Sequence, residues 1–288
     1  MTELRVNSWS ELQERLYENS YQPALGRTRS PYVFRGLPLV NYPLTTTLMR
    51  LGGNYAKMEH HLLRNFRKYA KREVVEQDSI WNWLAVAQHH GLPTRLLDWT
   101  FSPHVAMHFA TARLDQIDKD GIIWTVDFVR AHRLLPDALR EVMEDEGSEI
   151  FTAEMLTRVA GTIGDLEQLS DDPFLLFFEP PSLDDRIVNQ FALFSLISRS
   201  TEGFDRWVTE HTDLCRKIII PAELKWEVRD RLDQANITER VLFPGLDGLS
   251  RWLRRYYSPR SVAPAPLDPY DDLPNRPDDV VDGPTDFP

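Results

Sequence analysis

Cysteine is almost absent from this chain. The 288 residues include one, Cys215, so no internal disulfide can form, and we expect Cys215 to be a half-buried strand residue rather than a nucleophile. There is no run of about 18 apolar residues that would cross a membrane. The first residues lack the basic start and apolar stretch of a secretory signal. These absences predict a cytoplasmic protein without a membrane partner.

Positive charge is also in short supply. The chain has 33 basic and 44 acidic residues, and its formal net charge is −11. Such a chain repels the phosphate backbone over most of its surface, so we expect no bulk binding of nucleic acid. A local basic cleft remains compatible with this balance.

The sequence lacks the usual zinc signatures, because it has neither an HExxH motif nor a pair of cysteines. Six of its eight histidines nevertheless lie in one stretch, and two of them are one helical turn apart. Their spacing matches no four-ligand pattern, so we predict no metal site. The six are His60, His61, His89, His90, His104 and His108.

The apolar residues that are present follow strand spacing in some segments and helical spacing in others. Strands are predicted at 31–34, 94–97, 122–128, 174–178, 192–197 and 217–220. Helices are predicted at 8–17, 59–69, 80–90, 102–110, 222–232 and 248–256. This mixture predicts an α+β fold with a central mixed or antiparallel sheet and surrounding helices.

The organisation along the chain is predicted from composition. Residues 1–257 have a globular composition, and 131–171 within them are expected to be a helical insertion. Residues 258–288 are rich in proline and aspartate, which predicts a disordered acidic tail. Such a tail either only increases solubility or binds a protein partner.

Reactive side chains are concentrated at residues 88–100, between two predicted helices. Gly91 is expected to end the first helix, and Ser102 to cap the second. The polar residues between them are candidates for a binding or catalytic site. These candidates are Gln88, His89, Arg95, Asp98 and Thr100.

Arginines within apolar strands need acceptors, because an unpaired buried charge is costly. Arg35 ends a short predicted strand and is followed by Gly36, which allows a ligand or another backbone to approach closely. Arg95 lies in a second apolar strand, three residues before Asp98. Each arginine either pairs with Asp98 or offers its planar guanidinium to a phosphate or carboxylate of a ligand.

Two segments of the chain resemble the FRG family of bacterial and phage domains. One is Phe34, Arg35 and Gly36, which read Phe-Arg-Gly. The other is residues 88–100, which read Gln-His-His-Gly-Leu-Pro-Thr-Arg-Leu-Leu-Asp-Trp-Thr. The resemblance implies a bacterial or phage protein with a link to defence, but it implies no particular activity.

The order of these motifs is similar, more distantly, to the NAD-binding core of ADP-ribosyltransferases. The resemblance implies NAD as cofactor, Arg35 at its phosphates, and Thr100 with Ser102 beneath the nicotinamide ribose. Gln190 would stand where the family has a catalytic glutamate. Two departures weaken this likeness: Asp-Trp-Thr replaces Ser-Thr-Ser, and a glutamine replaces the glutamate.

Two functions therefore remain open. The first is an ADP-ribosyltransferase-like enzyme that acts on NAD or on a nucleic-acid or protein target, with His89, Asp98 and Gln190 as catalytic residues. The second is a non-catalytic module that uses the same cleft to recognise a nucleotide or another phosphorylated ligand. In both, the ligand-binding candidates are Arg35, Gln88, Arg95, Thr100 and Ser102.

Overall fold

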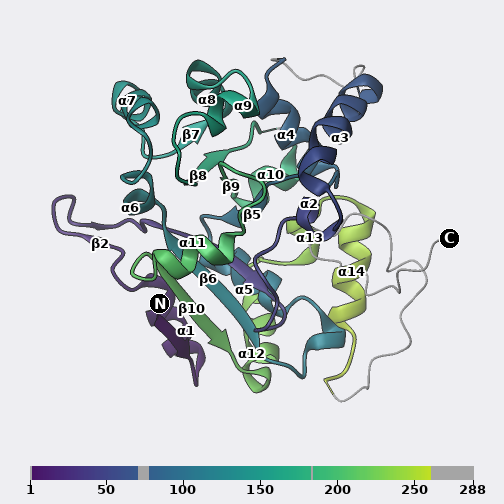
Figure 1. Cartoon of the computed structure of the whole chain (residues 1–288). Helices are drawn as coiled ribbons and strands as arrows, with labels where there is room; N and C mark the ends of the chain where they lie inside the picture. Colours follow the sequence, from purple (N-terminus) through teal and green to yellow (C-terminus); the bar gives the residue numbers. More distant parts are fainter. Residues whose placement is uncertain (1, 71–77, 183, 261–288) are drawn as a thin grey trace.

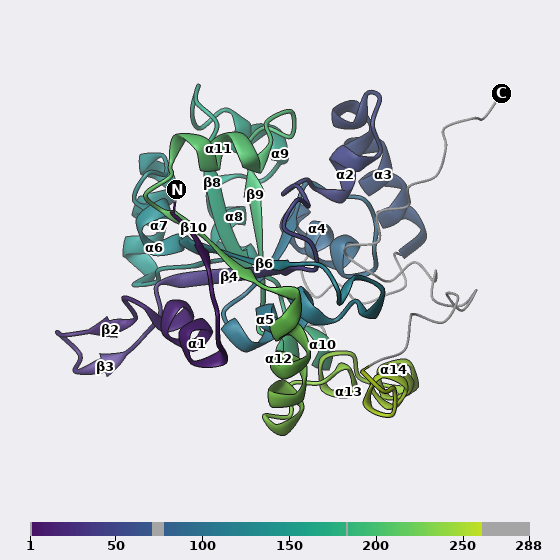
Figure 2. The same ribbon diagram turned by 90° about the horizontal axis from the view of Figure 1, so that it is seen from below.

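The computed structural model describes residues 2–70, 78–182 and 184–260. A mixed eight-stranded sheet occupies its centre, with helices on both sides (Figures 1 and 2). This confirms the predicted α+β class and its central sheet. Among the described residues, no helix is both long and apolar enough to cross a membrane.

The strands follow the order β1-β10-β6-β4-β5-β9-β8-β7 across the sheet. The β1–β10 and β7–β8 pairs are parallel, and the other neighbours are antiparallel. The bounds are β1 Thr2–Arg5, β4 Tyr32–Leu37, β5 Leu97–Thr100, β6 Gly121–Asp127, β7 Phe151–Thr152, β8 Leu175–Glu179, β9 Ala192–Ile197 and β10 Cys215–Ile220. A separate small hairpin consists of β2 Tyr21–Gln22 and β3 Arg27–Thr28.

The helices are α1 Trp9–Tyr17, α2 Thr47–Arg50, α3 Tyr55–Ala70, α4 Ile80–His89, α5 Pro103–Thr111, α6 Phe128–His132, α7 Asp137–Glu146, α8 Ala153–Val159, α9 Ile163–Glu167, α10 Asp185–Gln190, α11 Phe204–Glu210, α12 Ala222–Gln234, α13 Glu239–Leu242 and α14 Leu246–Tyr256. A short 3-10 helix covers Leu114–Gln116. The segment 131–171 thus holds α7, α8, α9 and the edge strand β7. The predicted tail lies outside the described residues, except for 258–260.

Local sequence signals define the ends of the helices beside the site. Ser79 and Ser102 accept hydrogen bonds from the third backbone N–H of α4 and α5, at 3.2 and 3.3 Å. Gly91 ends α4 in a left-handed conformation with φ 79°. These boundaries confirm the predicted ones, because capping depends only on neighbouring residues.

The strand predicted at residues 94–97 is wrong in position, since β5 begins at Leu97. The backbone N–H of Thr94 donates to the Thr47 hydroxyl at 3.1 Å, and that of Leu96 donates to the Thr94 hydroxyl at 3.1 Å. Those groups therefore do not join the sheet. Asp98 and Thr100, expected in a turn, lie in β5 and pair with β9.

A weak seam divides the sheet between β4 and β5. Strand β4 pairs with β6 along Tyr32–Leu37, but it pairs with β5 only at Phe34 opposite Thr100. Figure 2 shows β8 and β9 running at a steep angle to β4 and β6. The sheet therefore opens at the seam, where polar groups of β4 and β5 meet without a continuous ladder.

Three apolar clusters hold the two halves of the sheet. One packs α4 and α8 against β8 and β9, and a second packs α5 and α12 against β4, β6 and β10. The third covers the opposite face beneath α11, as the alternation of side chains along the strands requires. The first two clusters each belong to one half of the sheet, whereas the third spans the seam and joins β4 and β6 to β5, β8 and β9.

Gly36 lies inside β4, directly under helix α5. A Cβ atom at this position would lie 1.8 Å from the Ala106 carbonyl oxygen and 2.8 Å from the Ala110 nitrogen. The close approach expected at Gly36 is therefore made by the backbone of α5 and not by a ligand.

Replacing Gly36 with alanine should destabilise the fold, because α5 must move away from β4. Overpacking of this kind costs about 1–3 kcal/mol or more. Chemical denaturation should show the loss. Gly164→Ala is the control, since its added Cβ meets only the Thr162 hydroxyl at 3.7 Å and the residue lies in a helix. Equal stability of the two variants would contradict this packing argument.

His132, at the end of α6, is buried between two backbone groups. Its Nδ1 lies 2.9 Å from the Glu149 carbonyl oxygen, and its Nε2 accepts the Phe177 N–H at 2.9 Å. Burial lowers the pKa of His132 from 6.5 to about 4. The neutral ring is therefore the form that joins α6 to β8.

Stability should consequently decrease in acid. Between pH 6.5 and pH 4 the unfolded chain binds a proton at His132 that the folded chain does not, so the free energy of unfolding falls by about 3 kcal/mol. Urea denaturation across this range measures the fall. His132→Asn should lack this contribution, because an amide side chain does not titrate in this range. Identical pH dependence of the two proteins would contradict the assignment.

Candidate functional site

Arg35 crosses the seam from β4 to β5. Its Nη1 donates to the main-chain oxygen of Asp98 at 2.7 Å and lies 4.0 Å from the Asp98 carboxylate. The arginine side chain is 7% exposed, whereas the aspartate side chain is 33% exposed. Arg35 thus supports the strand from within, and Asp98 presents its carboxylate at the surface of the seam.

The last turn of α4 orients that carboxylate. Gln88 Nε2 donates to Asp98 Oδ2 at 2.9 Å, and Gln88 Oε1 accepts the Thr94 hydroxyl at 2.5 Å. Three polar side chains and the Arg35 guanidinium thus form one network, which we call the seam network: Arg35, Gln88, Thr94 and Asp98. It holds the Asp98 carboxylate in one orientation.

His89 follows Gln88 and pairs with a residue outside the motif. Its Nε2 lies 2.7 Å from Asp184 Oδ2, and Asp184 also caps α10 through the Ile187 N–H at 3.0 Å. Burial lowers the pKa of His89, and Arg186 adds to this effect while Asp184 opposes it. The pKa of Asp184 is also lowered, because these bonds outweigh its own desolvation.

Arg186, on the first turn of α10, is within electrostatic reach of the Asp98 and Asp184 carboxylates and contacts the ring of Phe243. Its guanidinium carbon is 5.2 Å from the ring centroid, and that of Arg251 is 4.6 Å from the same centroid. Burial lowers the pKa of Arg186, the two carboxylates raise it, and Arg251 lowers it further. The site therefore combines two cations, two carboxylates and an aromatic ring.

Arg95 lies apart from the seam network. Its guanidinium pairs with Glu59 at 2.5 Å, with Glu167 at 3.1 Å and with the Ser198 carbonyl oxygen at 2.8 Å. The partner suggested by the sequence, Asp98, is not the observed one. Arg95 joins α3 and α9 to the end of β9, which is a structural position.

Thr100, Ser102 and Gln190 form a second group. The Thr100 hydroxyl donates to the Gln190 main-chain oxygen at 2.7 Å and accepts the Ser102 N–H at 2.9 Å. The Gln190 amide donates to the Leu242 carbonyl oxygen at 2.9 Å. These contacts join the ends of β5, α10 and α13 beside the seam.

Metal and thiol chemistry find little support in the described part of the chain. No group of three or more His, Cys, Asp or Glu residues there is arranged to hold a metal ion. His104 lies 3.5 Å from the Tyr17 hydroxyl, and buried His108 accepts from Arg229 at 2.9 Å. Cys215 is buried, and burial raises its pKa to about 12, so the thiol stays protonated.

Sequence reasoning did not assign roles to Asp184, Arg186, Phe243 and Arg251. All four lie far along the chain from residues 88–100, and no spacing rule connects them to that segment. Asp184 could have been noticed as a helix cap, because it precedes the short run 185–190. The other three acquire their positions only through packing of α10, α13 and α14.

Removing the Arg95–Glu59 ion pair should lower the free energy of unfolding strongly. Arg95→Ala leaves a buried carboxylate without its partner, which costs about 3–5 kcal/mol. Arg206→Ala is the control, since its ion pairs are exposed and such pairs contribute about 0–1 kcal/mol. Urea denaturation of both variants tests this difference, and a loss below 1 kcal/mol for Arg95→Ala would contradict a structural role.

Comparison with known proteins adds one finding. Residues 30–119 match the family model described as FRG domain. No curated protein and no solved structure matches the chain. The matched range contains β4, α4, β5 and α5, and with them the whole seam network. The chain therefore contains a segment, residues 30–119, that matches the FRG domain.

Proposed function

We propose that this FRG domain protein binds a phosphorylated ligand of the nucleotide class, with Arg186 as the principal contact of the phosphate. The main support for this proposal is that the Arg186 side chain is partly buried but has few partners. It is half-buried, yet among the described residues its guanidinium makes no hydrogen bond or ion pair, only the contact with Phe243.

The other buried arginines behave differently. Arg35 and Arg95 donate to oxygen atoms as described above, and Arg229 and Arg255 donate to Glu239. A desolvated guanidinium with open donors is unfavourable, and a phosphate supplies two acceptors in matching geometry. Arg186, whose guanidinium also lies near two carboxylates and an aromatic ring, therefore gains from an anion.

The position of Asp98 favours a nucleotide over a bare phosphate as the ligand. Its carboxylate is one-third exposed, is oriented by Gln88, and lies close enough to Arg186 to raise the pKa of that arginine. A carboxylate beside an anion site can accept the hydroxyl groups of a ribose while the arginine binds the phosphate. The pair is thus suited to a phosphorylated sugar.

The side chains that the ADP-ribosyltransferase resemblance assigns to NAD make other contacts in the fold. Arg35 is buried and donates to Asp98, the Thr100 hydroxyl donates to Gln190, and the Gln190 amide donates to Leu242. We therefore derive no transfer step, and NAD is one of the ligands to be tested.

A second candidate function is catalysis on the bound ligand, and the His89–Asp184 pair favours it. A histidine with a lowered pKa is neutral near pH 7, and a hydrogen-bonded carboxylate fixes the orientation of its ring. Such a ring can accept a proton from a hydroxyl or a water. Mass spectrometry of ADP, ATP and NAD incubated with the protein would reveal turnover, and loss of that turnover in His89→Gln would assign the histidine.

Calorimetric titration with ADP, NAD and adenosine tests the binding function. The wild-type protein should bind the phosphorylated compounds and not adenosine. Arg186→Ala should weaken ADP binding by at least about tenfold, the value of one charge-assisted hydrogen bond. Arg186→Lys should fail similarly, because lysine lacks the planar fork.

Two controls separate loss of binding from loss of folding. The melting temperature of Arg186→Ala should stay near that of the wild-type protein, because the side chain makes no hydrogen bond within the described residues. The exposed Arg206→Ala serves as the matched control and should bind normally. Unchanged ADP affinity in Arg186→Ala, or no binding by the wild-type protein, would refute the proposal.

A further inference from the structure

We infer that the C-terminal unit α13–α14 forms the second wall of this site, with Arg251 as a second phosphate contact that selects ligands with two adjacent phosphates. This inference rests on the function proposed above. It adds a binding residue that lies 132 positions beyond the end of the FRG match at residue 119.

The two arginines share one aromatic ring. Arg186 comes from α10 and Arg251 from α14, and both guanidinium groups lie over Phe243, at 5.2 and 4.6 Å from its centroid. Cation–π attraction stabilises each of them, but the two positive charges repel. A ligand with two neighbouring negative groups would relieve this repulsion, whereas a single phosphate would offset only part of it.

Phe243 is fixed relative to Arg186 by two hydrogen bonds between α10 and α13. Asn189 Nδ2 donates to the Val241 oxygen at 2.8 Å, and Gln190 Nε2 donates to the Leu242 oxygen at 2.9 Å. These two carbonyl groups immediately precede Phe243 in the chain. The aromatic ring is therefore held beside α10 without any ligand.

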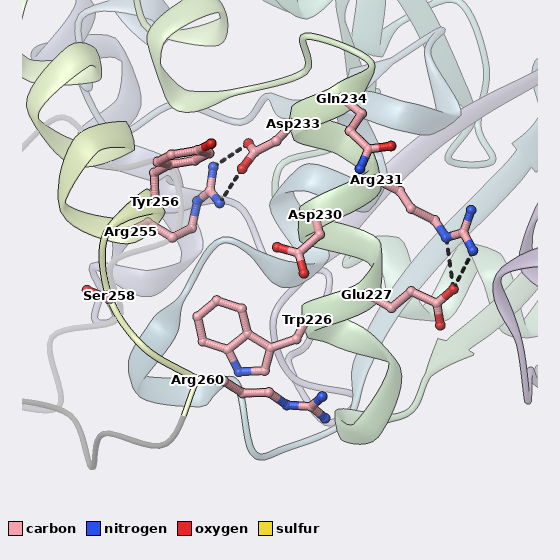
Figure 3. Close-up of a pocket in the computed structure, with 10 residues that line it drawn as sticks. All are labelled: Trp226, Glu227, Asp230, Arg231, Asp233, Gln234, Arg255, Tyr256, Ser258 and Arg260. Atoms are coloured by element: carbon pink, nitrogen blue, oxygen red, sulfur yellow. Dashed lines mark hydrogen bonds and ion pairs between the residues drawn. The ribbon is translucent and has the colours of Figure 1, made fainter.

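Helix α14, which carries Arg251, is anchored by a buried ion cluster around Arg255, one helical turn further along the chain. Arg255 of α14 pairs with Asp233 of α12 at 2.5 Å and with Glu239 of α13 at 2.7 Å. Figure 3 shows the Arg255–Asp233 pair beside a cavity of about 570 Å³ between α12 and α14. Arg229 also pairs with Glu239, at 2.7 Å. The cluster thus ties α14 to α12 and α13, and the Arg251 side chain itself donates to the Asp247 main-chain oxygen at 3.4 Å.

The same cluster connects α14 to the FRG motif. Arg229 donates to His108 of α5 at 2.9 Å, and α5 directly follows β5. Helix α14, which carries Arg251, is therefore joined by buried contacts to α5, the helix that follows the Asp98 strand. This preorganisation is what a selective anion site requires.

Titration with inorganic pyrophosphate and inorganic phosphate tests the inference. The wild-type protein should prefer pyrophosphate. Arg251→Ala should weaken pyrophosphate binding by about tenfold or more, and should leave phosphate affinity nearly unchanged because Arg186 remains. Arg251→Lys keeps the charge without the fork and should recover only part of the preference.

The controls separate this inference from the proposed function. Arg254→Ala changes an exposed arginine of the same helix and should bind like the wild-type protein. If Arg186→Ala abolishes binding while Arg251→Ala keeps the full pyrophosphate preference, the inference is refuted and the proposed function stands. If the wild-type protein binds ADP but neither inorganic anion, the inference is refuted and the proposed function stands; if it binds none of the three, both are refuted. Melting curves of every variant confirm that the ion cluster has remained intact.

Discussion

The hydrogen bond from Arg35 to the main chain of Asp98 joins the two halves of the sheet, together with the apolar cluster that spans the seam. Strands β4 and β5 share one register pair, so a regular ladder does not hold them. The buried guanidinium supplies a hydrogen bond across the gap instead. Because that bond goes to a backbone oxygen, the Asp98 carboxylate remains at the surface, where Gln88 orients it. One arginine thus both joins the sheet and shapes the site.

Buried charge is used repeatedly to join elements that are distant in sequence. Arg95 connects α3, α9 and the end of β9, and the cluster around Glu239 connects α5, α12, α13 and α14. In such pairs the arginine fork satisfies carboxylate oxygens that would otherwise be costly to bury. Arg186 stands out against this pattern, since the carboxylates nearest to it act through space without bonding it. That contrast is the physical basis for assigning it to a ligand.

The site extends well beyond the segment that carries the family motif. The FRG match ends at residue 119, while Asp184, Arg186, Phe243 and Arg251 reach the seam from later elements. Residues 30–119 supply the seam network, and the later elements supply the cations and the aromatic ring.

The sequence alone determined the helix boundaries beside the site, the α+β class and the segments where polar residues concentrate. Capping serines, Gly91 and the apolar spacing act over a few residues, so they can be read without a fold. It did not determine the start of β5, because Thr47 and the Thr94 hydroxyl take the backbone groups of the preceding residues. Nor did it show that Arg95 pairs with Glu59, or that Arg186 and Arg251 meet at Phe243. The Arg95–Glu59 and Arg186–Phe243 contacts join residues separated by tens of positions, and only the packing of helices on the two halves of the sheet brings them within reach.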